Sequence, residues 1–314
     1  MTRATVTPTQ FLLGVDGGGS KTTALLADAE GRILGRGSAG TANHFTVGIE
    51  QACAAIEQAV AASFVEAGLN RAPISALCFG LAGVDRPDNR VLFEPWIAEH
   101  FPNTKAALVN DAELVLAAGT PEGWGIALIC GTGMIVFGRN RQDERGRVDG
   151  WGYLLGDQGS GFSIGLAALQ AVMAAHDGRG APTLLTQMIL RHCNLESPLE
   201  LVRWIYRERV PTSEIAFLTR FVDAAAEQGD CIAQTILYQA ADQLVHSVQT
   251  LVKKLGFESE IPCAVAGGVI TNNLQISRSF DQAIARQGIT LQPITVVHEP
   301  AQGAIRIALR LLNR

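Results

Sequence analysis

Positive charge is scarce in this sequence. Lys and Arg number 25 against 30 Asp and Glu, which gives a formal net charge of −5 over 314 residues. Nucleic-acid-binding proteins need clustered Lys and Arg to neutralise phosphates, so this composition argues against DNA or RNA as a partner. Charged residues make up only 18% of the chain and apolar residues 47%, which is typical of a well-packed globular protein and excludes a largely disordered one.

Long apolar runs are missing as well. No segment approaches the roughly 20 consecutive apolar residues that a membrane-spanning helix needs. The first ten residues, MTRATVTPTQ, lack the apolar middle of a signal peptide. We therefore expect a cytoplasmic protein with no membrane partner.

Paired cysteines are also absent. The six cysteines are widely spaced, and none belongs to a CxxC pair. Most lie in apolar stretches such as ALCFG and ALICG, where cysteine behaves as a small hydrophobic residue. This pattern argues against zinc or iron–sulfur ligation.

Short apolar runs alternate with helical periodicity along the chain. Apolar residues recur at spacings of three and four between Ile49 and Phe64, and again over about 231–255, which predicts two amphipathic helices. The predicted strands, several of them apolar on both faces, cover 11–15, 22–28, 33–37, 75–80, 106–109, 125–130, 134–138, 262–266 and 290–297. The predicted fold class is α/β.

One pattern of strand, glycine-rich turn and strand occurs twice. FLLGVDGGGSKTTALLADA begins at Phe11, and WGIALICGTGMIVFG begins at Trp124. The length allows two domains, so we interpret the repeat as a duplicated unit with domains at 1–118 and 119–314. The mostly helical stretch at about 180–230 is expected to be an insertion in the second domain.

The first glycine run, Gly17–Gly19, is a candidate phosphate cradle, because glycine lets backbone N–H groups converge on an anion. A Walker A loop is excluded because Ser20 stands between the glycines and Lys21, and because a strand follows. A dinucleotide fingerprint fails because Thr22 replaces the third glycine. What remains is a phosphate-binding hairpin with Asp16 as a magnesium ligand, although a plain tight turn explains the same residues equally well.

Two further glycine segments fit the same interpretation. The second loop, Gly131–Gly133, repeats the device and adds the hydroxyl of Thr132. Two such hairpins, one from each half of the chain, are suited to bind a polyphosphate from opposite sides. A third pair, Gly267 and Gly268, precedes a helix predicted near Thr271, and its bare backbone suits a base or ribose, although a simple strand-to-helix turn needs the same residues.

Seven blocks in this order resemble the superfamily of sugar kinases, Hsp70 and actin. They are GVDGGGSKT, SAGTANHFTVG, LVNDAELVLAAG, ICGTGM, GWGYLLGDQGSG, VAGGVITN and EPAQGAIRIAL, and they span nearly the whole chain. Within the superfamily, the chain is most similar to the N-acetylglucosamine and glucosamine kinases of the BadF/BadG/BcrA/BcrD ATPase family.

The resemblance implies a fold and a reaction. It implies two actin-like (ribonuclease H-like) domains with a nucleotide cleft between them, and transfer of the γ-phosphate of ATP to the 6-hydroxyl of N-acetylglucosamine, with magnesium as cofactor. It also implies a homodimer. Carried over to this chain, it assigns Asp111 as the catalytic base, Asn43, Gly150, Trp151 and Asp157 to the sugar, and Gly18, Gly19, Ser20, Lys21, Gly131, Thr132, Gly267, Gly268 and Thr271 to the nucleotide.

The residue types suit that chemistry. In phosphoryl transfer the protein positions groups and stabilises charge, while an Asp accepts the proton of the attacking hydroxyl. Asn110 and Glu113 form a predicted capping box, so helix capping does not need Asp111. Asp157 also precedes a helix, whose dipole stabilises an anion even without a ligand, and Asn43 is a common turn residue.

Three alternatives remain open. Glucosamine is the nearest rival substrate, because nothing in the sequence decides between a free amine and an acetamide. A redox activator ATPase would need cysteines around an iron–sulfur cluster, and Cys130 has no second cysteine placed by motif to share one. A non-catalytic sugar sensor would need an added DNA-binding region, and only ten residues precede Phe11.

Overall fold

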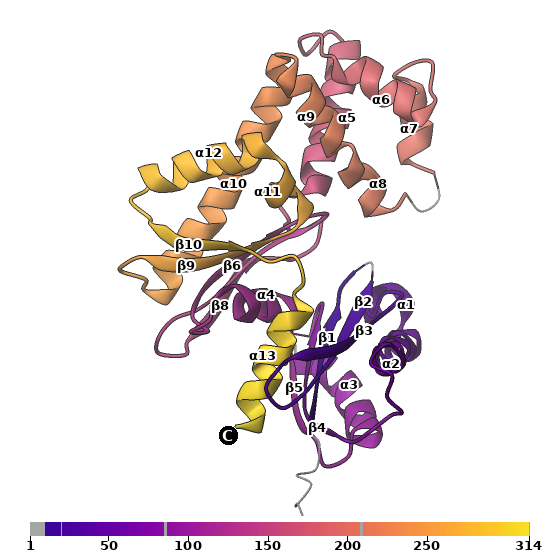
Figure 1. Cartoon of the computed structure of the whole chain (residues 1–314). Helices are drawn as coiled ribbons and strands as arrows, with labels where there is room; N and C mark the ends of the chain where they lie inside the picture. Colours follow the sequence, from indigo (N-terminus) through magenta and orange to yellow (C-terminus); the bar gives the residue numbers. More distant parts are fainter. Residues whose placement is uncertain (1–9, 20, 85–86, 208–209, 314) are drawn as a thin grey trace, which may run out of the picture. The chain divides into compact units, whose positions relative to one another are not determined.

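The chain forms two compact units, each built on one sheet (Figure 1). The computed structural model describes residues 10–19, 21–84, 87–207 and 210–313. The first unit contains the chain up to Gly123 together with 297–314, and the second contains 124–296. The sequence pattern predicts a boundary near 119, with the last helix in the second domain. That helix, α13 (Ala301–Leu312), belongs instead to the first unit.

The first unit contains a five-stranded mixed sheet in the order β3-β2-β1-β4-β5. The strands β1, β2 and β3 form an antiparallel meander, and β4 and β5 run parallel to β1. The five strands are Phe11–Gly17, Thr22–Ala27, Ile33–Ala39, Ile74–Leu81 and Lys105–Asn110, in chain order. Each one matches a predicted strand within two residues at either end.

Helices cover both faces of this sheet, as its doubly apolar strands require. The helices α2 (Ile49–Glu66) and α3 (Pro87–His100) pack on one face, with Leu13 and Val15 of β1 in that core. The other face carries α4 (Asp111–Gly119) and α13, and Leu12 of β1 points into this second core. A single turn, α1 (His44–Val47), precedes α2.

Three glycines let α4 and α13 approach the sheet and each other closely. A Cβ at Gly14 of β1 would lie 2.8 Å from the backbone nitrogen of Ile305 in α13. A Cβ at Gly303 of α13 would overlap the carbonyl oxygen of Leu114 in α4, and one at Gly80 of β4 would overlap the Leu114 side chain. These contacts explain why the C-terminal helix packs with the first unit, which the repeat pattern did not predict.

The second unit repeats the pairing pattern of the first. Its sheet has the order β10-β9-β6-β7-β8, with an antiparallel meander from β6 to β8 and with β9 and β10 parallel to β6. The strands β6 to β10 are Gly125–Cys130, Met134–Arg139, Arg145–Asp149, Ile261–Ala266 and Leu291–Val296. The predicted duplication therefore corresponds to two sheets of one topology. The polar strand β8 was not predicted because it has no apolar run.

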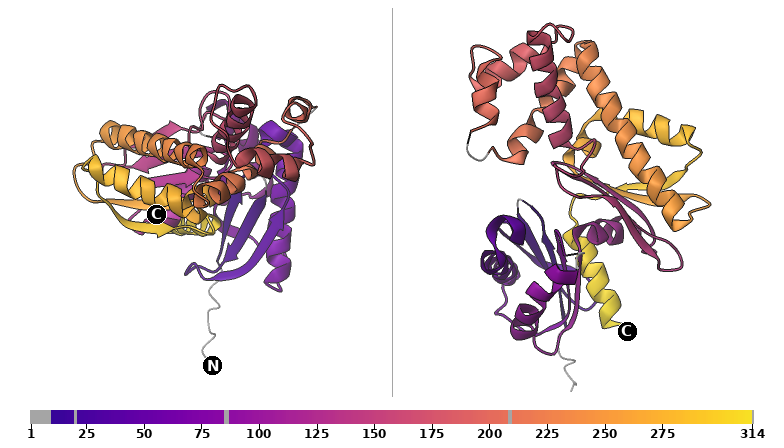
Figure 2. Two further views of the ribbon diagram at one scale, coloured as in Figure 1. Left: turned by 90° about the horizontal axis from the view of Figure 1, so that it is seen from above. Right: turned by 180° about the vertical axis from the view of Figure 1, so that it is seen from behind.

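Helices dominate the rest of the second unit. The long helix α10 (Cys231–Leu255) runs along its sheet, and α12 (Leu274–Arg286) lies beside α10 (Figure 2). The predicted stripe from Ile236 to Leu255 is buried on α10. The other helices are α5 (Gly161–His176), α6 (Leu185–Cys193), α7 (Glu200–Ile205), α8 (Thr212–Phe217), α9 (Thr219–Glu227) and α11 (Gly268–Asn272).

Two expectations from composition can be compared with the structure. Among the described residues, no helix combines the length and the apolar character that crossing a bilayer requires. All six cysteines are free, and Cys53, Cys78, Cys130 and Cys263 are buried, as expected of small hydrophobic residues.

Replacing Gly303 by alanine tests the helix packing. Alanine normally stabilises a helix interior by about 1 kcal/mol relative to glycine. Here the new methyl would overlap the Leu114 carbonyl, and overpacking of this kind costs about 1 to 3 kcal/mol, so we expect Gly303→Ala to lower the free energy of unfolding in urea titrations. Gly40→Ala is the control, because a Cβ there meets no atom within 4 Å. Equal midpoints for both variants would contradict the packing argument.

Candidate active site

The two acidic residues assigned to catalysis and to metal binding lie where the parallel strands of the first sheet end. The strands β1, β4 and β5 end there in register, with Gly17 beside Leu81 and Leu81 beside Asn110. Asp16 immediately precedes Gly17, and Asp111 immediately follows Asn110. This is the carboxyl edge of parallel strands, where α/β proteins place their ligands.

Asp16 is held in an unfavourable electrostatic environment. The pKa of its carboxyl group is raised to about 7, chiefly by burial and then by the negative charge of Asp111, while Lys21 opposes the shift. A divalent cation would compensate both carboxylates. Within the described part of the chain, no group of three or more His, Cys, Asp or Glu could hold a metal. That donor set still fits Mg²⁺, which typically takes one or two carboxylates and completes its shell with water and phosphate oxygens.

Asp111 occupies the first position of α4, and its neighbour caps the helix. The side chain of Asn110 accepts a hydrogen bond from the backbone nitrogen of Ala112 at 2.9 Å, so the predicted capping role of Asn110 is confirmed. The Oδ1 atom of Asp111 accepts from the same nitrogen at 3.0 Å. The half-buried Asp111 carboxylate is thereby oriented at the start of the helix.

The first glycine loop connects β1 to β2. A Cβ at Gly17 would overlap the Leu81 side chain, whereas one at Gly19 would meet nothing within 4 Å. The backbone nitrogen of Gly18 donates to the carbonyl oxygen of Lys21 at 3.1 Å, and the Lys21 side chain is exposed. Ser20 lies outside the described residues. The loop is therefore a tight turn anchored at Gly17, with open space next to Gly19.

Two threonine hydroxyls tie the segment that contains Asn43 to this loop. Thr22 donates to the carbonyl oxygen of Gly40 at 2.7 Å, and Thr41 donates to that of Gly18 at 3.0 Å. Asn43 follows directly and accepts from the backbone nitrogen of Phe45 at 3.1 Å, as the N-cap of α1. Neither threonine was predicted as a site residue from the sequence; the available signal was a hydroxyl residue next to each glycine segment.

A charged pocket of about 400 Å³ opens beside the first loop, within the first unit. Asp16 and Lys21 line it together with Arg36 of β3 and His298. Arg36 also makes a two-pronged ion pair with Glu299, with nitrogen–oxygen distances of 2.7 and 2.9 Å. This pair ties β3 to the segment that begins α13, and it lowers the pKa of the Glu299 carboxyl.

In the second unit, the second glycine loop lies against the start of α5. The carbonyl oxygen of Gly131 accepts from the nitrogen of Gly161 at 2.8 Å, and that of Thr132 accepts from Phe162 at 3.1 Å. A Cβ at Gly267 would overlap the carbonyl oxygen of Cys130. The second and third glycine segments are thus neighbours.

The residues around the third glycine segment differ in whether their polar groups already have a hydrogen-bond partner. Gly268 is exposed, and so is Thr132 in the neighbouring loop. The hydroxyl of Thr271 donates to the carbonyl oxygen of Gly267 at 3.0 Å, in the first turn of α11. The Thr271 hydroxyl is therefore bonded to the backbone of its own turn, while the backbone of Gly268 stays accessible.

Asp157 lies directly against the second loop. A Cβ at Gly133 would be 2.7 Å from its Oδ2 atom. Burial raises the pKa of the Asp157 carboxyl, while backbone hydrogen bonds from Met134 and Gly152 lower it. The structure therefore brings Asp157, which the resemblance assigned to the sugar, against the second glycine loop, which it assigned to the nucleotide.

Asp149 organises the loop that carries Asp157, and sequence reasoning did not identify it. Its carboxylate accepts backbone hydrogen bonds from Gly150 at 2.8 Å, from Asp157 at 2.6 Å and from Gln158 at 3.3 Å. The Asp149–Gly150 dipeptide, a typical turn signal, was the only clue. Trp151 in this loop is half-exposed, and the Arg147 guanidinium carbon lies 4.0 Å above its ring.

The pH dependence of stability tests the environment of Asp16. Because the folded-state pKa of about 7 is above the ordinary value of 3.8, folding favours the neutral form, and stability is lost progressively as the pH rises from 3.8 to about 7. A shift of about three units corresponds to about 4 kcal/mol. We expect Asp16→Asn to raise the free energy of unfolding by up to that amount at pH 8, and to have little effect at pH 4. A gain that does not depend on pH would contradict the burial of this charge.

Known proteins resemble the chain over nearly its full length. It is 34% identical to the N-acetylmuramic acid/N-acetylglucosamine kinase of Clostridium acetobutylicum over 95% of this chain and 98% of that protein. It is 32% identical to the N-acetyl-D-glucosamine kinase of Dictyostelium discoideum, over 96% and 98%.

A solved structure extends the comparison to the fold. The structure of a candidate N-acetylglucosamine kinase from Chromobacterium violaceum matches with a TM-score of 0.79 and 27% identity, covering 96% of this chain and 99% of that one. The predicted pair of actin-like domains is thereby confirmed. The sequence pattern of one family matches residues 13–308, and the chain belongs to that family, the BadF/BadG/BcrA/BcrD ATPases.

Proposed function

We propose that this protein is an ATP-dependent kinase that transfers the γ-phosphate to the 6-hydroxyl of N-acetylglucosamine. The observation that carries the proposal is the pairing of Asp111 with Asp16 at the edge where β1, β4 and β5 end. A second support is that the segment with Asn43 is tied to the glycine loop beside these acids. The names of the relatives, which are kinases of N-acetylglucosamine, point to the same class of substrate.

The proposed mechanism gives Asp111 the role of general base. Its carboxylate accepts the proton of the sugar hydroxyl as that oxygen attacks the γ-phosphorus, the bond from this phosphorus to the β,γ-bridging oxygen breaks, and ADP leaves with that oxygen. The backbone N–H group of Gly19, with Ser20 and the Lys21 ammonium, binds phosphate oxygens, because a Cβ at Gly19 would meet nothing within 4 Å. Gly18 closes the turn with its own N–H and, having no side chain, leaves room for the phosphate to approach. Asp16 holds Mg²⁺, which neutralises the phosphate charge when bound.

The second unit supplies the remaining contacts of the proposal. The exposed residues Thr132 and Gly268 serve the nucleotide. Asp157 accepts hydrogen bonds from sugar hydroxyls, and the half-exposed ring of Trp151 offers an apolar face to the C–H surface of a pyranose. Gly150 has a φ of +73°, which glycine adopts without strain. It therefore lets the backbone turn at the start of the loop that carries both Trp151 and Asp157.

A substrate panel tests the proposal. We expect the purified protein with ATP and Mg²⁺ to phosphorylate N-acetylglucosamine with a kcat/KM at least about tenfold above that for glucose, because a site built for the acetamide leaves polar groups unpaired without it. Coupling of the product phosphorus to the C6 protons would identify the acceptor oxygen. Glucosamine and N-acetylmuramic acid belong in the panel, the latter because one relative acts on it. Equal rates on glucose and both amino sugars would overturn the assignment.

Replacing Asp111 by asparagine tests the catalytic base. The amide keeps the shape but cannot accept a proton, so we expect kcat to fall by at least about a hundredfold, while affinities for sugar and nucleotide change only a few-fold. Asp88→Asn is a matched control, since Asp88 also lies in the first turn of a helix of the first unit. An Asp111→Asn variant with undiminished kcat in a coupled assay would remove Asp111 from the mechanism.

A further inference from the structure

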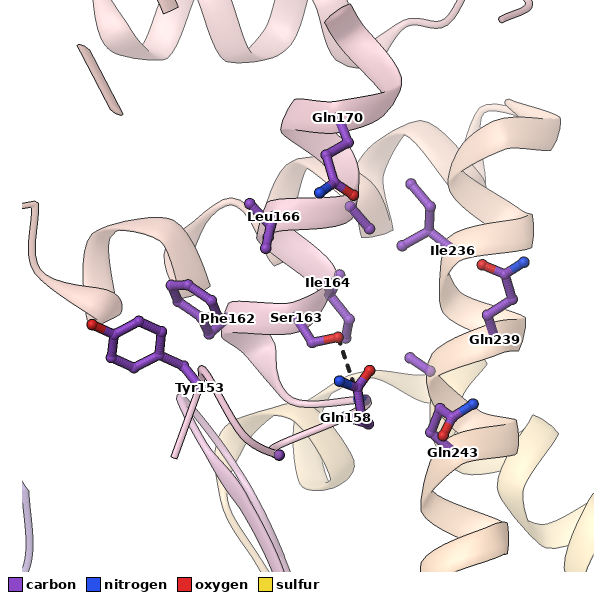
Figure 3. Close-up of a pocket in the computed structure, with 14 residues that line it drawn as sticks. Tyr153, Gln158, Phe162, Ser163, Ile164, Leu166, Gln170, Ile236, Gln239 and Gln243 are labelled. Carbon is purple, nitrogen blue, oxygen red and sulfur yellow. Dashed lines mark hydrogen bonds between the residues drawn. The ribbon is translucent and has the colours of Figure 1, made fainter. Parts of the chain in front are cut away.

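The second unit contains another pocket, which none of the assigned residues lines. It has a volume of about 430 Å³ and lies between α5 and α10 (Figure 3). Its apolar part includes Phe162 and Ile164 of α5 and Ile236 of α10, all buried. Its polar side chains include the four glutamines Gln158, Gln170, Gln239 and Gln243. Figure 3 shows Gln170 on α5 and Gln239 and Gln243 on α10, on opposite sides of the pocket.

The lining selects against charged ligands. None of the described residues that line the pocket is acidic, basic or histidine. An ion would lose hydration there without gaining a counter-charge. A carboxamide both donates and accepts hydrogen bonds, so four of them around an apolar floor suit an uncharged molecule with many hydroxyl or amide groups. A pyranose, with its C–H face and its ring of hydroxyls, has this character, and the volume is within the range of small-molecule sites.

The pocket shares a wall with the loop that carries Asp157. Both residues that flank Asp157, Gly156 and Gln158, line the pocket, and so does Gly159. The nitrogen of Gly159 donates to the Ser163 hydroxyl at 3.4 Å. A Cβ at Gly159 would lie 2.6 Å from the carbonyl oxygen of Ala240, so the loop packs directly on the backbone of α10. A ligand in the pocket would therefore contact the loop and α10 together.

We propose that this pocket is an effector site for an uncharged sugar, with N-acetylglucosamine itself as the ligand. Binding there stabilises the conformation of the loop that presents Asp157, and so strengthens binding of the acceptor sugar, because a ligand shifts a conformational equilibrium toward the state it contacts best. The coupling is reciprocal by linkage. This inference rests on the proposed kinase activity for its consequence, but the binding site itself does not.

The charge of the ligand gives the proposal a sharp corollary. The phosphorylated product carries between one and two negative charges near neutral pH, and the described lining offers no cation to pair with them. The effector site therefore binds the unphosphorylated sugar and rejects the product. Occupancy of the pocket would thus follow the concentration of the substrate, and the product would not compete for it.

Equilibrium dialysis of the full chain with labelled N-acetylglucosamine, without nucleotide, tests the site. We expect two molecules bound per chain. In the double variant Gln239→Leu/Gln243→Leu, and separately in Gln170→Leu, we expect binding at the second site to weaken at least about tenfold, the equivalent of one or two lost hydrogen bonds. Gln249→Leu is the matched control, because Gln249 lies on α10 but bonds to Gln287 outside the pocket. N-acetylglucosamine 6-phosphate should not displace the second molecule.

Turnover measurements separate this proposal from the kinase proposal. We expect the rate to rise more steeply than a hyperbola with sugar concentration in the wild type, and to become hyperbolic in the double variant with kcat within about twofold. A single bound sugar per wild-type chain, unchanged binding in the double variant, or displacement by the 6-phosphate would overturn the effector site while leaving the kinase intact. Two-site binding without any turnover would support the effector site and overturn the kinase proposal. Altered sedimentation of the double variant would assign the pocket to an interface between copies, and would also overturn it.

Discussion

The close packing of α13 and α4 on the first sheet is the constraint on which the rest of the first unit depends. Gly14, Gly80 and Gly303 remove the side chains that would hold these backbones apart. Because α4 can then lie against β4, its first residue, Asp111, is held at the strand ends beside Asp16. The position of the proposed base is thus determined in part by contacts of Leu114, three residues further along α4, with residues that have no proposed chemical role.

The same arrangement places the carboxylates of Asp16 and Asp111 close together, where their negative charges are unfavourable for folding. Burial and the charge of Asp111 both raise the pKa of Asp16, and only Lys21 acts in the other direction. Acidic groups with such shifts are found where a protein holds a cation or handles a proton. The first unit therefore gives up stability near neutral pH at the place where magnesium and phosphate would restore it. Asp157 in the second unit shows a milder form of this balance, since backbone hydrogen bonds offset part of its burial.

Local patterns in the sequence were enough to predict most of the secondary structure. The apolar runs predicted β1 to β7, β9 and β10, and the glycine loops predicted the duplication, because hydrophobic periodicity and turn chemistry act over a few residues. Asn110 was recognised as a cap for the same reason. The polar strand β8 escaped notice, since it pairs at a sheet edge and has no apolar run to mark it.

The remaining features depend on contacts between distant parts of the chain. The place of α13 in the first unit follows from glycines almost 300 residues apart in sequence, Gly14 and Gly303. Asp149 became visible only when its hydrogen bonds to residues 150–158 were seen, because an isolated Asp–Gly pair marks a turn without saying what the carboxylate holds. The pocket between α5 and α10 likewise joins glutamines that are scattered in sequence and carry no motif.

The two threonine hydrogen bonds near the first glycine loop have a mechanical consequence. The hydroxyls of Thr22 and Thr41 bond the segment that leads to Asn43 to the β1–β2 hairpin, so a shift of one piece of backbone strains its contacts with the other. In the proposed enzyme, one piece serves the phosphate donor and the other the acceptor. A displacement of either piece by its ligand is then passed to the other through these two hydrogen bonds, without any rearrangement of the sheet. Binding of one substrate is thereby coupled to binding of the other through a contact only a few residues wide.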